Sequence, residues 1–169
     1  GRGILAFGNG GEYVGDWLFD VFHGEGTRRF SNGDVYTGEF ERGLRQGQGR
    51  FYYANGDMYW GTWKKGQMHG PGRYYYASGQ RFEGHFAHGK RVGYGKLQLS
   101  NGCLELFQYL ADQRVGQGVR WNKARTVAWR LWKPKNRWQR SKITQAEAVS
   151  LAYEMERASL EALEEQGLQ

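Results

Sequence analysis

Residues of the same type recur along this chain at intervals of 23, and this spacing constrains the fold more than any other feature of the sequence. One column of the repeat consists of Gly24, Gly47, Gly70, Gly93 and Gly116, and a second glycine column lies two residues further on. Aromatic residues recur in the same register. A fixed period of this length is typical of proteins built from stacked structural units, each of which contacts its neighbours.

Each repeat contains two strand-like pieces separated by turn signals. The first reads Tyr-x-Gly-x-aromatic, as in residues 59–63, so the two rings and the glycine alternate and share one face of a strand. The second follows a Gly-x-Gly and ends in an apolar or aromatic residue, as in residues 73–76. Asn-Gly pairs such as Asn55-Gly56 favour tight turns. Each repeat is therefore predicted to be a β-hairpin. We expect an all-β repeat fold, an elongated single-layer antiparallel sheet of stacked hairpins.

The glycine content supports this interpretation. Glycine accounts for 27 of the 169 residues, and 26 of these glycines precede residue 119. The chain is also 16% aromatic, which argues against a disordered glycine-rich polymer. A glycine between two aromatic residues leaves space for a ring to lie across the strand. The glycines of Gly-x-Gly and Asn-Gly suit the positive φ angles of tight turns.

This pattern resembles the MORN repeat (membrane occupation and recognition nexus). The clearest copy reads Tyr59-Trp60-Gly61-Thr62-Trp63, then Gly66, then His69-Gly70-Pro71-Gly72, then Gly79. The resemblance covers residues 1–118, with a truncated first copy, about four full copies and a degenerate last copy. That last copy has Glu105 and Phe107 where tyrosine and glycine belong, as end repeats often do. Other departures from the motif are Gln46, Val92 and Asp20. Because the chain opens within a repeat, we expect further repeats before Gly1.

Charge and glycine content divide the chain into three parts. Residues 1–118 contain the repeats, and we expect residues 119–142 to be a basic docking segment and residues 143–169 an amphipathic helix. Between 120 and 142 there are nine lysines and arginines and no acidic residue, whereas residues 143–169 contain six glutamates and one arginine.

The basic segment also holds four of the seven tryptophans. Its candidate contact residues are Trp121, Arg125, Trp129, Arg130, Trp132, Lys133, Lys135, Arg137 and Trp138. The tryptophans could dock the segment against the end of the sheet or a partner and leave the cations in water. The alternatives are an acidic protein partner, an anionic membrane surface or nucleic acid. No RNA-binding motif accompanies the segment, so nucleic acid is not expected.

The last part begins with a capping box, Thr144-Gln145-Ala146-Glu147, followed by good helix formers up to Glu165. The contact face of this C-terminal α-helix is predicted from its apolar spacing. It consists of Leu151, Met155, Leu160 and Leu163. An apolar face of this width needs a partner, which could be the sheet of the same chain or another chain. The small, alanine-rich character of the face slightly favours another chain.

No arrangement of residues points to catalysis, a cofactor or a metal. His85 and His88 are three residues apart, but a zinc site needs three or four ligands. No nucleophile elbow, Walker A motif or dinucleotide fingerprint is present. The single cysteine, Cys103, excludes an internal disulfide framework and favours an intracellular setting. We therefore expect a protein that is not an enzyme.

The resemblance implies a cytoplasmic scaffold that binds protein partners and belongs to the cytoskeleton. MORN proteins occur in cilia and flagella, notably in the radial spokes of the axoneme, and some hold a helix or extended peptide in an aromatic groove. The predicted groove residues are Tyr13, Trp17, Tyr36, Phe40, Tyr59, Trp63, Phe82 and Phe86. The alternative for these rings is that they form the core. Two further hypotheses are a peripheral membrane scaffold that binds anionic phospholipid through the basic segment, and the regulatory part of a larger enzyme.

Overall fold

The computed structural model of the chain describes residues 1–166, which fall into two compact units. Unit 1 comprises Gly1–Ala77, and unit 2 begins at Ser78. Residues 1–166 contain thirteen β-strands, a short 3₁₀ helix and an α-helix. The predicted class, an all-β repeat of antiparallel hairpins with a C-terminal helix, is confirmed.

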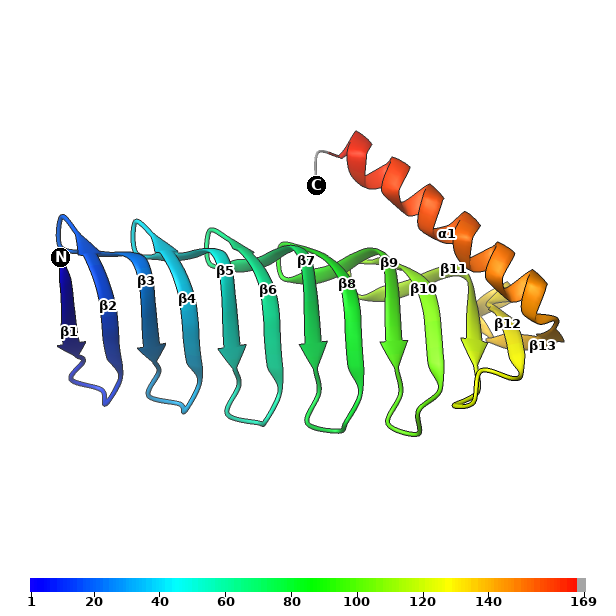
Figure 1. Cartoon of the computed structure of the whole chain (residues 1–169), viewed down its shortest axis with the longest axis horizontal. Helices are drawn as coiled ribbons and strands as arrows, with labels where there is room; N and C mark the ends of the chain where they lie inside the picture. Colours follow the sequence, from blue (N-terminus) through cyan, green and yellow to red (C-terminus); the bar gives the residue numbers. More distant parts are fainter. Residues whose placement is uncertain (167–169) are drawn as a thin grey trace. The chain divides into compact units, whose positions relative to one another are not determined.

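The strands of unit 1 pair antiparallel in chain order, each with the next (Figure 1). They are β1 (Arg2–Ala6), β2 (Glu12–Leu18), β3 (Val21–Arg29), β4 (Val35–Glu41), β5 (Leu44–Tyr52), β6 (Met58–Lys64) and β7 (Gln67–Tyr75). Seven-residue and nine-residue strands alternate after β1, because each repeat contributes one strand of each length.

Unit 2 continues the same alternation and then adds two short strands and the helices. Its elements are β8 (Arg81–Ala87), β9 (Lys90–Gln98), β10 (Leu104–Leu110), β11 (Gln113–Trp121), β12 (Ala128–Trp132), η1 (Pro134–Asn136), β13 (Gln139–Ile143) and α1 (Gln145–Glu165). These strands also pair antiparallel in chain order. The basic segment therefore forms the last two strands of the unit 2 sheet.

Two-residue turns close the hairpins. Arg42 and Gly43 have φ angles of 51° and 81°, and Lys65 and Gly66 have 50° and 80°. Two successive residues of positive φ are typical of a type I′ turn, whose backbone twist matches the twist of the two flanking strands. The second turn position is usually glycine because a side chain is strained there.

The Gly-x-Gly motif lies inside the second strand of each hairpin, not before it as predicted. Strand β5 begins at Leu44 and already contains Gly47 and Gly49. The register of the β4–β5 pair shifts after Gly38, so the extra residues form a β-bulge. Gly47 lies in that bulge with a φ of 60°, so its positive φ serves a bulge and not a turn.

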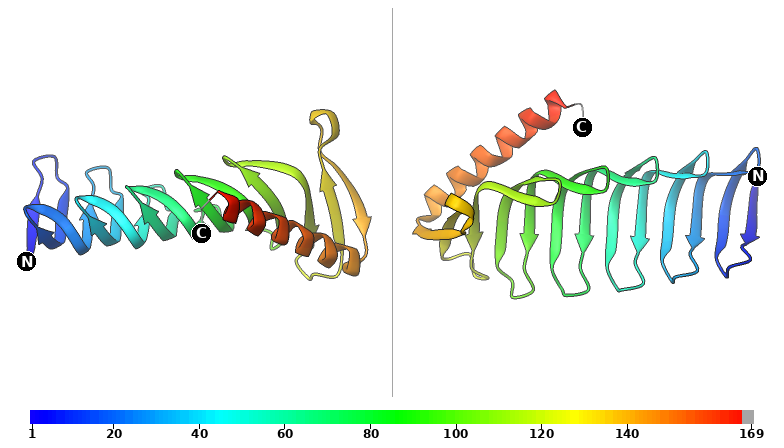
Figure 2. Two further views of the ribbon diagram at one scale, coloured as in Figure 1. Left: turned by 90° about the horizontal axis from the view of Figure 1, so that it is seen from above. Right: turned by 180° about the vertical axis from the view of Figure 1, so that it is seen from behind.

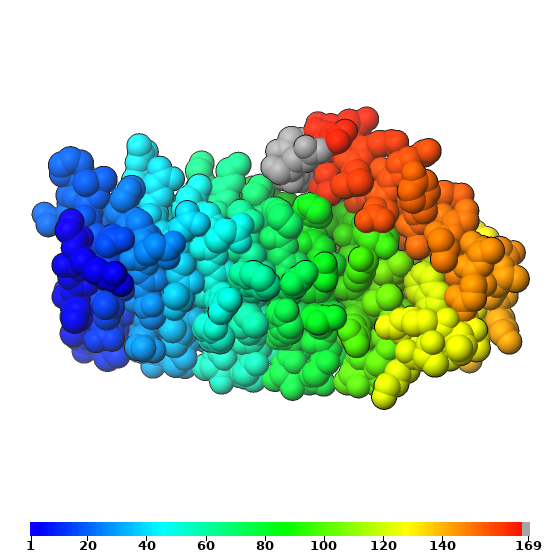
Figure 3. All heavy atoms as spheres, viewed as in Figure 1, coloured from blue at the N-terminus to red at the C-terminus, as the bar shows by residue number. Residues whose placement is uncertain are grey.

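Alternation along the strands gives the sheet of each unit two different faces. We call the side that carries Tyr59, Gly61 and Trp63, and the equivalent residues of other repeats, the aromatic face. The opposite side, the outer face, carries Met58 and Trp60. In unit 2 the helix α1 packs on the outer face, where Leu106 and Val119 belong to its buried contact (Figure 2). Figure 3 shows the atoms of α1 against those of unit 2.

Candidate functional site

A tyrosine ring lies across a pair of facing glycines in three repeats. Gly61 and Gly72 lie opposite each other in β6 and β7, and the Tyr59 ring covers both. A Cβ atom added at Gly61 would lie 2.5 Å from the Tyr59 hydroxyl oxygen. The hydroxyl donates a hydrogen bond of 3.0 Å to the carbonyl of Thr62 at the bulge. The prediction that this glycine lets a ring cross the strand is confirmed.

The second ring of each motif packs edge-on against the first and against the preceding repeat. The Trp63 ring is 5.2 Å from the Tyr59 ring at 87°, and 5.3 Å from the Tyr36 ring at 82°. Phe40 is held in the same way between Tyr36 and Tyr13. Edge-to-face contact is the geometry that the ring quadrupole favours. The rings thus connect one hairpin to the next within unit 1.

The predicted groove residues are almost all inaccessible in the free chain. The most buried rings, each 0% exposed, are those of Tyr13, Tyr36, Tyr59 and Phe82, and Phe40, Trp63 and Phe86 are at most 4% exposed. Trp17 alone of the eight is half-buried. These side chains therefore form the core beneath the aromatic face.

A layer of half-buried side chains, which we call the accessible layer, covers these rings, and sequence reasoning did not single it out. In unit 1 it includes Phe22, Arg45 and Met68, which occupy one column of the repeat at intervals of 23. The Arg45 guanidinium lies 4.4 Å from the Trp63 ring centre and donates to the Gly66 carbonyl at 2.5 Å. Burial lowers the pKa of Arg45. Sequence analysis did not identify this column, because Phe22, Arg45 and Met68 occupy the same position of the repeat but differ in chemical type.

The same column in unit 2 contains Arg91 and Arg114. Arg91 lies 4.9 Å above the Tyr109 ring and forms an ion pair of 2.9 Å with Asp112. Arg114 lies 4.8 Å above the Phe107 ring. Arginine is favoured in such positions because its planar guanidinium stacks on a ring while its N–H groups point outward. The layer therefore combines aromatic surface with positive charge.

The last repeat replaces the tyrosine and glycine of the motif by a buried ion-pair cluster and a ring. Glu105 occupies the tyrosine position, is 0% exposed and accepts hydrogen bonds from Nε and Nη2 of Arg120. Its second oxygen lies 2.5 Å from Nη2 of Arg114. Phe107 occupies the glycine position, and its ring lies over Gly118. The two departures from the motif compensate each other, because Phe107 fills the space that the absent tyrosine leaves.

A pocket of about 370 Å³ opens beside this cluster. It lies on the aromatic face of unit 2, where the residues of strands β10 to β13 come together. Its lining consists of Phe107, Arg114, Arg120, Leu131, Trp138, Gln139 and Arg140. Three of these seven residues are arginines, so the pocket is suited to an anionic ligand.

A family model of the MORN repeat matches residues 13–35, 36–58, 59–81 and 82–104. These four consecutive copies cover more than half of the chain. The chain belongs to the MORN-repeat family. No curated protein sequence matched the chain significantly. MORN repeats generally serve binding and scaffolding, and the matched repeats are consistent with a non-catalytic role of this kind.

The four MORN copies end at residue 104, and the basic segment further along the chain contributes β12 and β13 to the sheet. Trp121 is 7% exposed and its indole donates to Gln145, and Trp129 and Trp132 are half-buried. Trp138 is 40% exposed and packs edge-on against Phe107 at 5.2 Å. The other predicted contact residues of the segment are exposed: Arg125, Arg130, Lys133, Lys135 and Arg137. Three of the four tryptophans are thus buried or half-buried, whereas these five cations are exposed, and Arg125 also donates to the Gly102 and Asn122 carbonyls.

The helix α1 packs on the sheet of its own chain, so the slight preference for another chain is wrong for its buried side. Met155 and Leu163 are buried there, and Leu151 is half-buried. Ser159, which was not predicted, is 3% exposed and accepts a hydrogen bond of 2.6 Å from the Tyr94 backbone N–H. Leu160 is 48% exposed and lies outside this contact, because it directly follows Ser159 on the helix.

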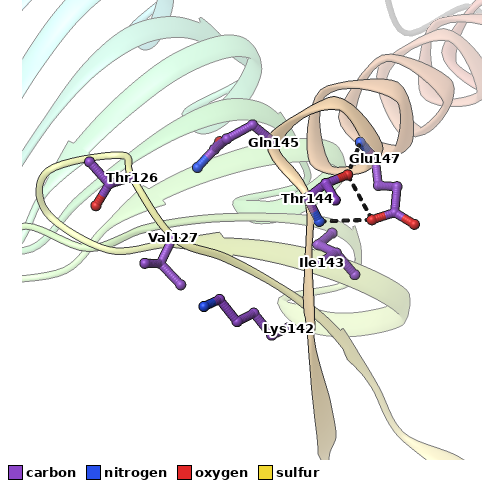
Figure 4. Close-up of a pocket in the computed structure, with 7 residues that line it drawn as sticks. All are labelled: Thr126, Val127, Lys142, Ile143, Thr144, Gln145 and Glu147. Carbon is purple, nitrogen blue, oxygen red and sulfur yellow. Dashed lines mark hydrogen bonds between the residues drawn. The ribbon is translucent and has the colours of Figure 1, made fainter.

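The predicted capping box at the start of α1 is confirmed. Figure 4 shows it at the edge of a pocket of about 410 Å³ that Lys142 also lines. The Thr144 hydroxyl accepts from the Glu147 N–H, and the Glu147 carboxylate accepts from the Thr144 N–H at 2.7 Å. These hydrogen bonds hold the pKa of Glu147 below its usual value. The capping box thus satisfies the backbone N–H groups of Thr144 and Glu147 at the start of the helix.

Among residues 1–166, no group of three histidine, cysteine, aspartate or glutamate side chains could hold a metal ion. Nor is any helix in the same range long and apolar enough to cross a membrane.

Proposed function

We propose that this MORN-repeat protein is a non-catalytic scaffold that binds a partner helix or extended peptide on the aromatic face of its repeats. The observation that carries the proposal is the accessible layer above the buried rings. Arg45 and Met68 cover a floor of rings in unit 1, and Arg91 and Arg114 do so in unit 2. Aromatic, methionine and arginine side chains are the types enriched in protein interfaces.

The rigidity of the floor supports this role. Tyr59 is fully buried and hydrogen-bonded, and Trp63 is 3% exposed. The accessible layer therefore rests on side chains that are already ordered, and a partner would lose less entropy on binding than on a mobile surface. The buried rings are proposed to act by positioning the accessible layer and to touch a partner only at their edges.

Two methionines on neighbouring strands permit a matched test in unit 1. Met68 of β7 lies opposite Trp63 on the aromatic face, and Met58 of β6 lies opposite Tyr75 on the outer face. Both are half-buried. We expect Met68→Glu to abolish recovery of the partner in a pull-down from native extract, and Met58→Glu to preserve it. Equal recovery with both variants would show that the aromatic face is not the binding surface.

The finer proposal is a cytoplasmic structural subunit of a cytoskeletal assembly, specifically a radial-spoke-like component of a ciliary or flagellar axoneme. It rests on the family resemblance. The same pull-down, made from ciliated cells and analysed by mass spectrometry, tests it. Axonemal proteins that are lost with Met68→Glu would support this assignment. A partner set without axonemal proteins would contradict it while leaving the scaffold role intact.

A second candidate function is peripheral binding to anionic phospholipid. The observation that favours it is the exposed tip of the β12–β13 hairpin, where Lys133, Lys135, Arg137 and Trp138 lie together, directed away from α1 in the left view of Figure 2. Each exposed cation near an anionic surface contributes about 1 kcal/mol. We expect a variant with the three cations changed to glutamine to lose co-sedimentation with phosphatidylserine liposomes. Unchanged binding would exclude this segment as the membrane contact.

A further inference from the structure

We propose that the pocket lined by Arg114, Arg120 and Arg140 binds an acidic residue of a peptide, together with an apolar side chain beside it. This inference rests on the proposed function, because it names the chemistry of a partner lying on the aromatic face. The pocket lies outside the four matched MORN copies, which end at residue 104. All residues that line the pocket therefore follow the matched repeats in the sequence.

The buried Glu105 organises the positive charge of the pocket. It binds Arg120 through Nε and Nη2 and Arg114 through Nη2, so both guanidiniums are held in place. Their side chains are nevertheless 33% and 32% exposed, so part of each guanidinium faces the pocket. A guanidinium carries five N–H donors, more than Glu105 uses. The remaining donors are therefore available to a second oxyanion.

Arg140 is the arginine of the pocket that has no internal partner. Over residues 1–166 it forms no hydrogen bond or ion pair, and it is exposed on β13 opposite Leu131. Three arginines against one glutamate leave this cluster with an excess of two positive charges. That excess matches one or two acidic groups, whereas a polyanion is bound by a basic groove that follows its backbone.

The other walls of the pocket are apolar. Leu131 is 8% exposed, Phe107 is buried, and the exposed Trp138 closes edge-on against the Phe107 ring. A volume of about 370 Å³ exceeds what a single carboxylate fills and suits a small group of side chains. An acidic residue could therefore pair its carboxylate with the arginines, while a neighbouring apolar side chain packs against the apolar wall.

The pocket adjoins the accessible layer of unit 2. Arg91 stacks on Phe82 and Tyr109, and Arg114 stacks on Phe107 and also lines the pocket. A peptide lying on the aromatic face of unit 2 would therefore reach the pocket without leaving that face. Because Arg114 belongs to both the accessible layer and the pocket, we infer that the ligand is part of a peptide and not a free anion.

The experiment is an NMR titration of the full chain with defined capped peptides. The probes are acetyl-Gly-Leu-Glu-Leu-Gly-amide and the same peptide with glutamine or phosphoserine in place of glutamate. The readout is the indole N–H resonance of Trp138, assigned with Trp138→Phe. We expect the glutamate peptide to shift this resonance and to bind about tenfold more tightly than the glutamine peptide, since a charge-assisted hydrogen bond is stronger than a neutral one. Tighter binding of the phosphoserine peptide than of the glutamine peptide would also support the oxyanion site.

A matched pair of arginine variants locates the binding. Arg140 lines the pocket, whereas Arg130 of the paired strand β12 alternates with Leu131 and faces the other side. Both are exposed, so neither substitution should unfold the chain. We expect Arg140→Gln to weaken the glutamate peptide about fivefold or more and Arg130→Gln to leave it unchanged.

Several results would overturn the proposal. They are equal binding of the glutamate and glutamine peptides, no effect of Arg140→Gln, or binding of inorganic phosphate as tight as that of the glutamate peptide. The last would indicate a free-anion site. The proposed scaffold function fails separately, through equal pull-downs with Met68→Glu and Met58→Glu. The pocket is measured with purified chain and synthetic peptides, so the two failures are distinguishable.

Discussion

Replacement of Tyr59 by alanine tests whether the motif rings are core or binding surface. Tyr59 is 0% exposed, covers the Gly61–Gly72 pair and donates to the Thr62 carbonyl. Removing a buried aromatic ring typically costs about 3–5 kcal/mol. Loss of the buried hydrogen bond adds about 1 kcal/mol. The sum, about 4–6 kcal/mol, is a large fraction of the roughly 5–15 kcal/mol that stabilises a typical domain.

We therefore expect Tyr59→Ala to lower the free energy of unfolding by about 4–6 kcal/mol in urea, monitored by circular dichroism. Because repeats are stabilised by their neighbours, hydrogen exchange should accelerate in β6 and in the strands paired with it. Tyr52 is the control, since it is 43% exposed on the outer face of β5. Tyr52→Ala should cost less than about 1 kcal/mol.

A Tyr59→Ala protein that stays within about 1 kcal/mol of the wild type would refute this reasoning. Such a result would show that the Tyr59 ring is not a core residue. If the same variant also lost partner binding, the ring would be assigned to the binding surface. Tyr59→Phe separates the two contributions, because it removes only the hydroxyl. Phe82 occupies the same position in unit 2 without a hydroxyl, so we expect a cost of about 1 kcal/mol.

Three further predictions concern the helix and the glycine pairs. Ser159→Ala should cost about 1–3 kcal/mol in urea unfolding and accelerate exchange of the Tyr94 amide, because that N–H loses its acceptor; unchanged protection would disprove the contact. Gly61→Ala should destabilise by about 1–3 kcal/mol or more, whereas Gly8→Ala, where an added Cβ meets nothing within 4 Å, should be neutral in the same unfolding assay. The pKa of Glu147 is lowered in the folded chain, so its contribution to stability is present above the unfolded-state pKa and is lost as the pH falls through the folded value; an NMR titration that gives Glu147 an ordinary pKa would contradict this.

Much of the fold follows from the spacing of residues. The 23-residue period, the Tyr-x-Gly-x-aromatic alternation and the capping box at Thr144 predict hairpins and a final helix, and the structure contains both. Prediction was less successful for the Gly-x-Gly motif, which suggests a turn but forms a bulge within a strand. The local sequence predicts a positive φ at Gly47, and its φ is 60°. The local sequence does not show whether the partner strand continues past that point.

The candidate site was predicted only in part. The eight motif rings are evident from their spacing, but their burial depends on how each ring lies across facing glycines and against the preceding repeat. The accessible layer was missed because Phe22, Arg45 and Met68 share a position without sharing a chemistry. Glu105 was noted only as a departure from the motif, because its arginine partners come from a different strand.

The sequence by itself determines the repeated hairpin, since steric and turn preferences act over a few residues and recur in every copy. Only the tertiary structure decides which residues are accessible. Arg120 and Arg140 are twenty residues apart and line one pocket because β11, β12 and β13 pair side by side. Ser159 becomes buried because α1 packs on the strand that contains Tyr94. Burial and charge pairing depend on neighbours distant in sequence, and no local pattern records them.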